Sequence, residues 1–327
     1  MKKLIASVKW RRWRAHPGSV SIALLLAGLA MGVNEVTAGE QKVCSKTTQL
    51  AFKACGKDVQ DNYWIETGKC LNLADPDEAA ECRAEAKATN KDDATLCKEQ
   101  RDARGDVCAA LGEGPYDPPI DPADFVDPAA IGDTIAPNAY FPLVPGVTRI
   151  YESEDETDTV TVTDETTEIL GVTCAVVHDV VESGGEVIED TTDWYAQDVE
   201  GNVWYFGEIA QNFEDGKLNN LDGSWEAGVD GAKPGILMKA IPAVGDVYRQ
   251  EWALGEAEDI AEVLSTTASE SAPAASCAGD CVLTHDFTPI EPDASESKYY
   301  APGFGVIVVL DDNDPTIREE LVEVIGP

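Results

Sequence analysis

Six cysteines in the first third of the chain are spaced symmetrically about a single proline: Cys44, Cys55, Cys70, Cys82, Cys97 and Cys108. Pro76 is the midpoint of the innermost, the middle and the outermost pair. In a continuous α-helix, the first three cysteines would fall within one stripe roughly 80° wide, and the last three would do the same. Two antiparallel helices that meet at Pro76 would therefore face each other with their cysteines in register. The spacing predicts three nested disulfides: Cys44–Cys108, Cys55–Cys97 and Cys70–Cys82.

The composition of residues 39–113 fits a disulfide-stapled antiparallel helical hairpin. The segment is rich in Ala, Glu, Lys, Asp and Gln and poor in β-branched residues, which favours helix. Pro76 would stop the first helix, and Asp77 would cap the second. Each disulfide contributes roughly 2–4 kcal/mol to stability, which offsets the scarcity of large apolar side chains. A metal or redox site is disfavoured here, because the segment has neither a Cys-x-x-Cys motif nor a histidine.

Residues 1–38 have the layout of a secretory signal peptide. A basic segment precedes an apolar stretch at 20–33, and the small residues Val36, Thr37 and Ala38 come before Gly39. Roughly 14 apolar residues are too few to span a bilayer, so we expect a cleaved signal rather than a membrane anchor. The chain has 9 cysteines, which an exported protein would largely oxidise to disulfides. We expect a periplasmic or extracellular protein with no integral membrane segment after cleavage.

The charge of the chain narrows the classes of partner. Residues 1–38 hold six basic side chains and one acid, so their removal would change the formal net charge from −37 to −42. Such a charge disfavours binding to nucleic acid and to anionic lipid surfaces. Solubility explains it, and calcium stabilisation of an acidic surface protein is an alternative. The sequence Asp311-Asp312-Asn313-Asp314 lacks the glycine that an EF-hand loop has at its sixth position.

The composition changes twice after the cysteine-rich segment. Residues 114–145 are rich in proline and aspartate and predict an extended linker that wraps or spaces. Residues 146–327 show short alternating apolar and polar runs broken by Gly, Asp and Asn, which is typical of antiparallel strands. The fold class that we expect is α+β: the helical hairpin followed by a strongly curved antiparallel sheet or partly open barrel.

An aromatic hairpin is the clearest signal in the β-domain. Residues 193–206 read DWYAQDVEGNVWYF, and Glu200-Gly201-Asn202 forms the turn. Neighbouring aromatics on a strand point to opposite faces of the sheet. One face would therefore cover a core, and the other needs the linker, the helical hairpin or a ligand as a cover. The residues of this possible ligand face are Trp194, Tyr195, Trp204, Tyr205 and Phe206.

Several phrases in this domain resemble signatures of a group of exported bacterial β-sheet proteins that has no assigned activity. They are FPLVPGVTRIYE (141–152), DWYAQDVEGNVWYFGE (193–208), SWEAGVDGAKPGI (224–236) and KYYAPGFGV (298–306). The resemblance covers most of residues 138–325. It implies an exported β-sheet domain and supplies neither an activity nor catalytic residues.

The two histidines that follow the signal peptide lie in two similar sequence segments: Cys174-AVV-His178 and Cys281-VLT-His285. Because residues i and i+4 of a strand share a face, adjacent strands would bring these four residues together as a zinc or copper site. The competing explanations are a cross-strand disulfide Cys174–Cys281, with Cys277 unpaired, or a small loop closed by Cys277–Cys281, with Cys174 unpaired.

The sequence offers little support for an enzyme. It contains no G-x-S-x-G, no H-E-x-x-H and no glycine-rich phosphate loop. We therefore expect an exported, non-enzymatic binding or structural protein of the bacterial envelope, whose partner is an unidentified small ligand or envelope protein. No cofactor is predicted. The alternatives are a zinc- or copper-binding periplasmic protein and a calcium-stabilised surface protein.

Overall fold

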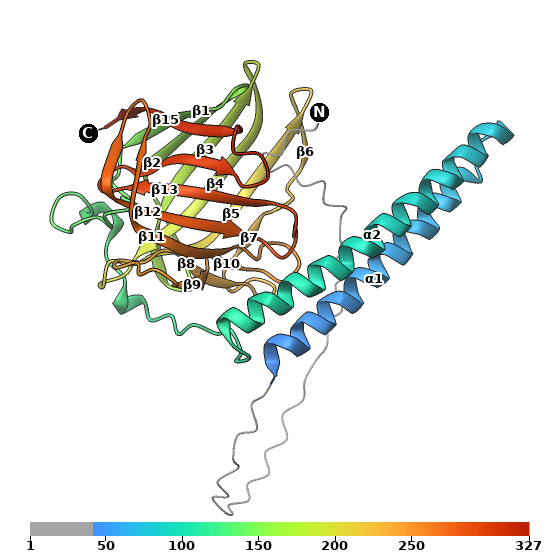
Figure 1. The fold of residues 1–327 in the computed structure, drawn as a ribbon, viewed down its shortest axis with the longest axis horizontal. Helices are drawn as coiled ribbons and strands as arrows, with labels where there is room; N and C mark the ends of the chain where they lie inside the picture. The colour runs from blue at the N-terminus through green and yellow to red at the C-terminus, as the bar shows by residue number, and fades with distance from the viewer. Residues whose placement is uncertain (1–41, 327) are drawn as a thin grey trace, which may run out of the picture.

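The fold is described from a computed structural model for residues 42–326. The predicted signal peptide, residues 1–38, lies outside the described residues. Figure 1 shows two parts, a long helical hairpin and a strongly curved sheet with the linker at its side. Within residues 42–326, neither helix combines the length and the apolar character that a bilayer crossing requires.

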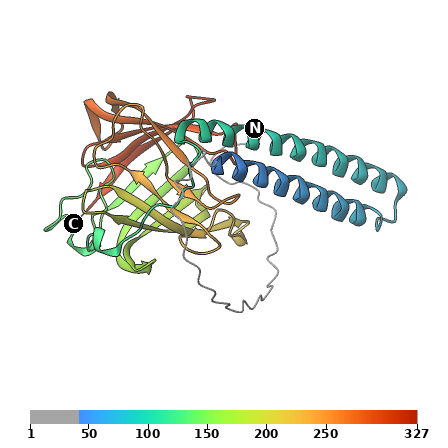
Figure 2. The ribbon, with the colours of Figure 1, turned by 90° about the horizontal axis from the view of Figure 1, so that it is seen from below.

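The hairpin consists of α1 (Val43–Cys70) and α2 (Pro76–Leu111), which run side by side away from the sheet (Figures 1 and 2). Three disulfides join the two helices at Cys44–Cys108, Cys55–Cys97 and Cys70–Cys82. The linked Cα atoms are 5.5 to 5.8 Å apart. These are the nested pairs that the spacing about Pro76 predicts, so the disulfides hold the two helices in a fixed register.

The bend between the helices depends on a residue other than the predicted cap. The Asp75 carboxylate accepts hydrogen bonds from the backbone N–H groups of Asp77, at 2.8 Å, and of Glu78, at 3.1 Å. Asp75 is therefore the N-cap of α2, and Pro76 takes the first helical position, where its missing N–H is not needed. The expectation that Asp77 caps this helix was wrong by two residues.

Short 3-10 helices and fifteen strands follow the hairpin. The 3-10 helices are η1 (Pro122–Asp124) and η2 (Pro128–Ala130). The first strands are β1 (Thr148–Glu152), β2 (Glu156–Ile169), β3 (Val172–Ser183), β4 (Glu186–Gln197), β5 (Val203–Glu214), β6 (Lys217–Asn220), β7 (Trp225–Glu226) and β8 (Lys233–Met238). The remaining strands are β9 (Val247–Arg249), β10 (Glu251–Trp252), β11 (Ile260–Ser271), β12 (Ser276–Phe287), β13 (Ser295–Ala301), β14 (Gly305–Asp311) and β15 (Arg318–Ile325).

These strands form one antiparallel sheet that nearly closes on itself. Its order is β10-β8-β5-β4-β3-β2-β1-β15-β14-β13-β12-β11-β9, and β6 and β7 pair with β5. Register shifts interrupt several pairings, and such bulges increase the bend of a strand. The predicted fold class, an α+β chain with a helical hairpin and a partly open barrel, is confirmed.

The two edges of the sheet meet at one seam, which the chain itself crosses. Only Gln250 separates β9, which pairs with β11, from β10, which pairs with β8. A Cβ atom on Gly235 of β8 would lie 2.3 Å from the carbonyl carbon and oxygen of Gln250. Glycine is therefore required at residue 235, because any side chain would push β8 away from the chain that closes the barrel.

The linker packs into the barrel rather than only spacing the two parts. Ile131 and Leu143 are buried in the same core as Phe206. The Phe125 ring packs edge-on against Trp204, with ring centres 6.2 Å apart, and against Phe206, at 5.6 Å. The linker is thus the cover for this face of the aromatic hairpin, one of the three covers that the sequence allows.

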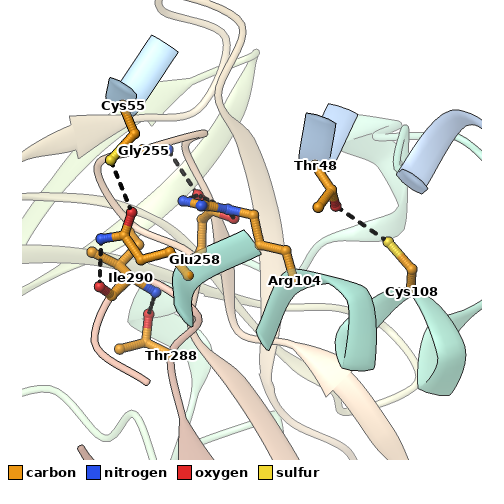
Figure 3. A network of polar contacts seen from close by, with 9 residues as sticks. Thr48, Cys55, Arg104, Cys108, Gly255, Glu258, Thr288 and Ile290 are labelled. Carbon is orange, nitrogen blue, oxygen red and sulfur yellow. Dashed lines mark hydrogen bonds and ion pairs between the residues drawn. The ribbon is translucent and has the colours of Figure 1, made fainter. Parts of the chain in front are cut away.

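The base of the hairpin is anchored to the barrel through buried polar contacts (Figure 3). The Arg104 guanidinium donates to both carboxylate oxygens of Glu258, from Nε at 2.9 Å and from Nη2 at 2.6 Å. One turn earlier, the Gln100 amide donates to the Ile290 carbonyl at 2.8 Å. Both donors lie near the C-terminal end of α2, and the bend of the hairpin lies at its opposite end.

Candidate functional site

Acidic side chains share the interior face of the barrel with core valines. Directly paired residues of an antiparallel sheet place their side chains on the same face. One row across β2 to β5 is Val162, Val177, Asp193 and Glu208. The two rows beside it are Val160, Asp179, Thr191 and Ala210, then Asp158, Val181, Glu189 and Asn212. Because Val162 and Val177 are buried in the core, this face is the inner one.

The wall formed by β9 to β15 carries acids on its inner face as well. One row is Tyr248, Ala261, Asp286 and Glu296, and another is Val263, Thr284, Lys298, Val309 and Glu319. Val263 and Tyr248 are buried in one apolar cluster, which identifies this face as the inner one. The negative charge of Asp179 on β3 raises the pKa of Glu319 on β15, so the two walls act on each other electrostatically.

We call the carboxylates of both walls and of the seam the acidic interior: Asp158, Asp179, Glu189, Asp193, Glu208, Glu251, Asp259, Asp286, Glu296 and Glu319. Lys298 lies among them, with its Nζ 3.3 Å from Asp286 Oδ2 and 3.4 Å from Glu296 Oε2. Burial lowers the pKa of this lysine, but the neighbouring carboxylates outweigh burial and hold the pKa well above its ordinary value. Arg149 of β1 is paired with the inward Val160 and adds a second positive charge on this face. The two positive charges are outnumbered by the ten carboxylates.

Several carboxyl groups of the acidic interior hold their protons to unusually high pH. Burial raises the pKa of Asp193 to about 8, and the charge of Asp179 adds to the increase. Burial is also the main cause that raises the pKa of Asp158 and of Glu319 to about 7. The pKa of Glu208 lies well above its ordinary value for the same reason, with repulsion from Asp193 as the next cause. Several of these groups therefore titrate near neutral pH.

Some carboxylates of the acidic interior remain in contact with solvent. Asp158, Asp179, Glu208 and Glu319 are each partly accessible, although burial is the largest cause of their raised pKa values.

Two buried polar atoms in one cross-strand row have no hydrogen-bond partner among the described residues. They are Tyr248 Oη and Asp286 Oδ1, on residues that are 7% and 6% exposed. Tyr248 and Asp286 flank Ala261 in that row. Buried polar atoms in proteins are nearly always paired, so these two point to a ligand or an ordered solvent molecule.

Tyrosine rings line the interior next to the acids. Tyr195 and Tyr205 stack with ring centres 4.5 Å apart, and the Tyr205 hydroxyl donates to Asp193 at 2.5 Å. Of the five aromatics predicted as a possible ligand face, these two lie in one cross-strand row, and both are buried. Trp204 and Phe206 lie under Phe125 of the linker, and Trp194 is partly buried against the same core.

The four residues predicted as a zinc or copper site do not come together. Cys281 forms a disulfide with Cys277, and Cys174 is buried and unpaired. The expected Cys174–Cys281 disulfide is therefore wrong, because β3 and β12 are separated in the sheet by β2, β1, β15, β14 and β13. Of the two histidines, His178 is exposed on β3, and His285 on β12 has its Nε2 3.3 Å from Asp312 Oδ2. Within residues 42–326, no group of three or more His, Cys, Asp or Glu side chains is arranged to hold a metal ion.

The fold and the interior define the class of protein: a disulfide-stapled helical hairpin attached to a nearly closed antiparallel barrel that encloses acids and tyrosines. Its four disulfides are typical of proteins that fold in an oxidising environment. Comparisons with protein-family models, with curated proteins and with solved structures find no significant match to the chain.

Proposed function

We propose that this protein is a non-enzymatic binding protein of the bacterial envelope, periplasmic or at the cell surface, that holds a small organic cation inside its barrel. The observation that carries the proposal is the pair of unpartnered atoms, Tyr248 Oη and Asp286 Oδ1, within a described interior of excess negative charge. An ammonium group on the ligand would donate to Asp286 and leave Tyr248 within reach of a second polar group.

Electrostatics favours a cationic ligand over a neutral or anionic one. Burial of unpaired charge is costly, and the carboxylates of the acidic interior repel one another when they are ionised. A ligand with one or more ammonium groups would replace bound protons as the compensating charge. The faces of tyrosine rings such as the stacked pair Tyr195 and Tyr205 also attract cations, which adds to the selectivity for amines over metal ions.

The residue types of the interior support binding rather than catalysis. His178 and His285 alternate with the inward residues Val177, Asp179 and Asp286, so both imidazoles lie on the outer face of the sheet. The proposal therefore assigns the interior carboxylates to recognition of charge. Export is supported by the disulfides and by the signal peptide that the sequence predicts.

The test is binding of aliphatic amines to the purified mature protein at neutral pH. Native mass spectrometry and calorimetry with putrescine, spermidine and choline should detect a stoichiometric complex with at least one of them. Asp286→Asn should weaken that complex by about tenfold to a hundredfold, the value of a buried charge-assisted hydrogen bond. Glu262→Gln is the matched control, because Glu262 lies on the neighbouring strand and pairs with the outward His285. The absence of binding by all three amines, or equal weakening by the two variants, would refute the proposal.

Calcium is the second candidate ligand. Burial and the charge of Asp158 on the adjacent strand raise the pKa of Asp179 well above its ordinary value, so this pair of carboxyl groups favours a bound proton that a dication could replace. A calcium-stabilised protein would melt at a lower temperature after dialysis against chelator and would recover on addition of calcium. An unchanged melting temperature in chelator would remove calcium and leave the amine proposal intact.

A further inference from the structure

A small cavity lies where the helical hairpin, the linker and the barrel seam meet, and it is distinct from the acidic interior. Its volume is about 40 Å³. Its polar wall is formed by Thr48, Arg104, Tyr116, Arg249 and Glu258. Val43, Val107, Trp252, Leu254 and Pro289 contribute apolar surface. One water molecule needs roughly 10–15 Å³ of such volume, so the cavity has room for about three particles of that size.

The charges around this cavity do not balance. Arg104 and Arg249 each carry a positive charge, and Glu258 is the carboxylate between them. Figure 3 shows that Glu258 is turned toward Arg104. Both of its oxygens accept from that guanidinium, and one also accepts from the Gly255 N–H at 2.8 Å. Glu258 therefore neutralises Arg104 and leaves Arg249 without an ion-pair partner among the described residues.

Arg249 is buried although no ion pair to it is found among the described residues, which is unusual for an arginine. It is 9% exposed, and its Nη1 has no hydrogen-bond partner in the described part of the chain. Its guanidinium carbon lies 5.5 Å from the centre of the Tyr116 ring. This cation–π contact supplies only weak compensation for the charge. The Tyr116 hydroxyl is committed elsewhere, since it donates to the Pro234 carbonyl at 2.9 Å. Burial lowers the pKa of Arg249 although the charge of Glu258 opposes this effect, so Glu258 compensates the guanidinium only in part. An anion beside the guanidinium would remove most of the remaining cost.

We propose that this cavity binds one small monovalent anion, of the size of chloride, with Arg249 as its principal ligand. Guanidinium N–H groups bind anions through directed hydrogen bonds, and a cavity of about 40 Å³ fits a small anion better than a larger organic one. The cavity is lined from α1, α2, the linker and β9 together. The bound anion therefore stabilises the attachment of the hairpin to the barrel seam.

The test compares sodium chloride with sodium gluconate at constant ionic strength, using the melting temperature of the full mature protein. Each tenfold increase in chloride above its dissociation constant is expected to raise the melting temperature by about 3 to 5 °C. Gluconate should not replace chloride. Crystals soaked in bromide should show an anomalous peak in contact with the Arg249 guanidinium.

Variants separate specific binding from general salt effects. Arg249→Met should abolish the chloride-dependent rise, and Arg249→Lys should retain part of it. Arg318→Met is the control, because Arg318 is an arginine on β15 that is already paired with Glu270 and Glu320. A rise of the same size in gluconate, or in Arg249→Met, would overturn the proposal. If Arg249→Met does not fold, the bromide soak of the wild-type protein decides: no peak beside Arg249 rejects the site.

Discussion

Arg104 of α2 and Glu258 of the β10–β11 loop form a buried, hydrogen-bonded ion pair, and this pair joins the helical hairpin to the barrel. The two side chains are 7% and 2% exposed. An ion pair at this depth adds little net stability over apolar residues of similar volume, but removal of one partner leaves a buried charge unpaired. The attachment of the hairpin therefore depends on both residues being present together.

Replacement of Arg104 alone should be strongly destabilising. Arg104→Met leaves the Glu258 carboxylate buried without its guanidinium and should lower the free energy of unfolding by about 3–5 kcal/mol. The double variant Arg104→Met/Glu258→Met should recover much of that loss. Urea denaturation measures both. Lys233→Met removes an exposed pair with Asp117 and should cost less than about 1 kcal/mol. Equal effects of Arg104→Met and Lys233→Met would contradict this account.

The barrel should become more stable as the pH falls from 8 to 5. Asp193 has a pKa of about 8 in the folded protein, and Asp158 and Glu319 have pKa values of about 7. Carboxyl groups in the unfolded chain have pKa values of about 4. Between pH 5 and pH 8 the folded state therefore binds more protons than the unfolded state. The free energy of unfolding is then largest at low pH and decreases as pH rises through 7 and 8. Melting temperatures measured from pH 5 to 8 test the sign.

A neutral substitution should reduce this pH dependence. Asp193→Asn removes a carboxyl group with a raised pKa and should flatten the decrease in melting temperature between pH 6 and 8. Asp190→Asn is the control, because Asp190 points to the opposite face of β4. A melting temperature that is constant or increases from pH 5 to 8 in the wild-type protein would disprove the assignment of raised pKa values.

The seam should not tolerate a side chain at residue 235. Gly235→Ala places a Cβ against the Gln250 backbone and should destabilise the protein by about 1–3 kcal/mol, the usual cost of overpacking. Gly56→Ala in α1 is the matched control, because a Cβ there meets nothing within 4 Å. The control should stabilise by about 0.5–1 kcal/mol, since alanine favours helix more than glycine. Thermal unfolding of the two variants should show shifts of opposite sign.

The disulfides should differ in their value for stability according to the loops that they close. Cys55–Cys97 has a sequence separation of 42, and Cys277–Cys281 has a separation of 4. In the chain-entropy model, removal of the disulfide that closes the longer loop lowers the free energy of unfolding by about 4 kcal/mol. Removal of the disulfide that closes the shorter loop lowers it by about 2 kcal/mol. The double alanine variants of each pair, compared by urea denaturation, should follow this order. A larger loss for the Cys277–Cys281 pair would contradict it.

Cys174 should behave as an unreactive thiol in the native protein. It is buried, and burial raises its pKa to about 12, so the reactive thiolate is scarce at neutral pH. A maleimide reagent should label it only after denaturation. Peptide mapping without reductant should recover Cys174 as a modified single peptide and should link Cys277 to Cys281. Recovery of a Cys174–Cys281 peptide would overturn this pairing.

Local signals in the sequence predicted the hairpin well and the interior poorly. The symmetric cysteines determine both the bend and the register of the helices, because helical geometry converts sequence spacing into position. The Cys174–Cys281 pairing failed because sheet adjacency is not encoded in either phrase, and β3 and β12 lie far apart in the strand order.

The acidic interior escaped prediction because acids in strands are ordinarily expected to face solvent. A signal for it was nevertheless present. Asp158 has the same strand parity as Val160 and Val162, and Asp179 lies between the same-face residues Val177 and Val181. Acids that alternate in phase with valines, rather than out of phase, indicate a face that is both enclosed and charged.

The hairpin acts as a rigid arm of fixed length. Arg104 anchors α2 to the barrel, and Pro76 begins the same helix at the bend. At a rise of about 1.5 Å per residue, these two residues lie roughly 42 Å apart along the helix axis. Three covalent crosslinks prevent the two helices from sliding or separating along that length. A force applied at the bend, for example by a bound partner, is therefore transmitted along the hairpin to its base. The base contacts the barrel beside the seam where the sheet closes.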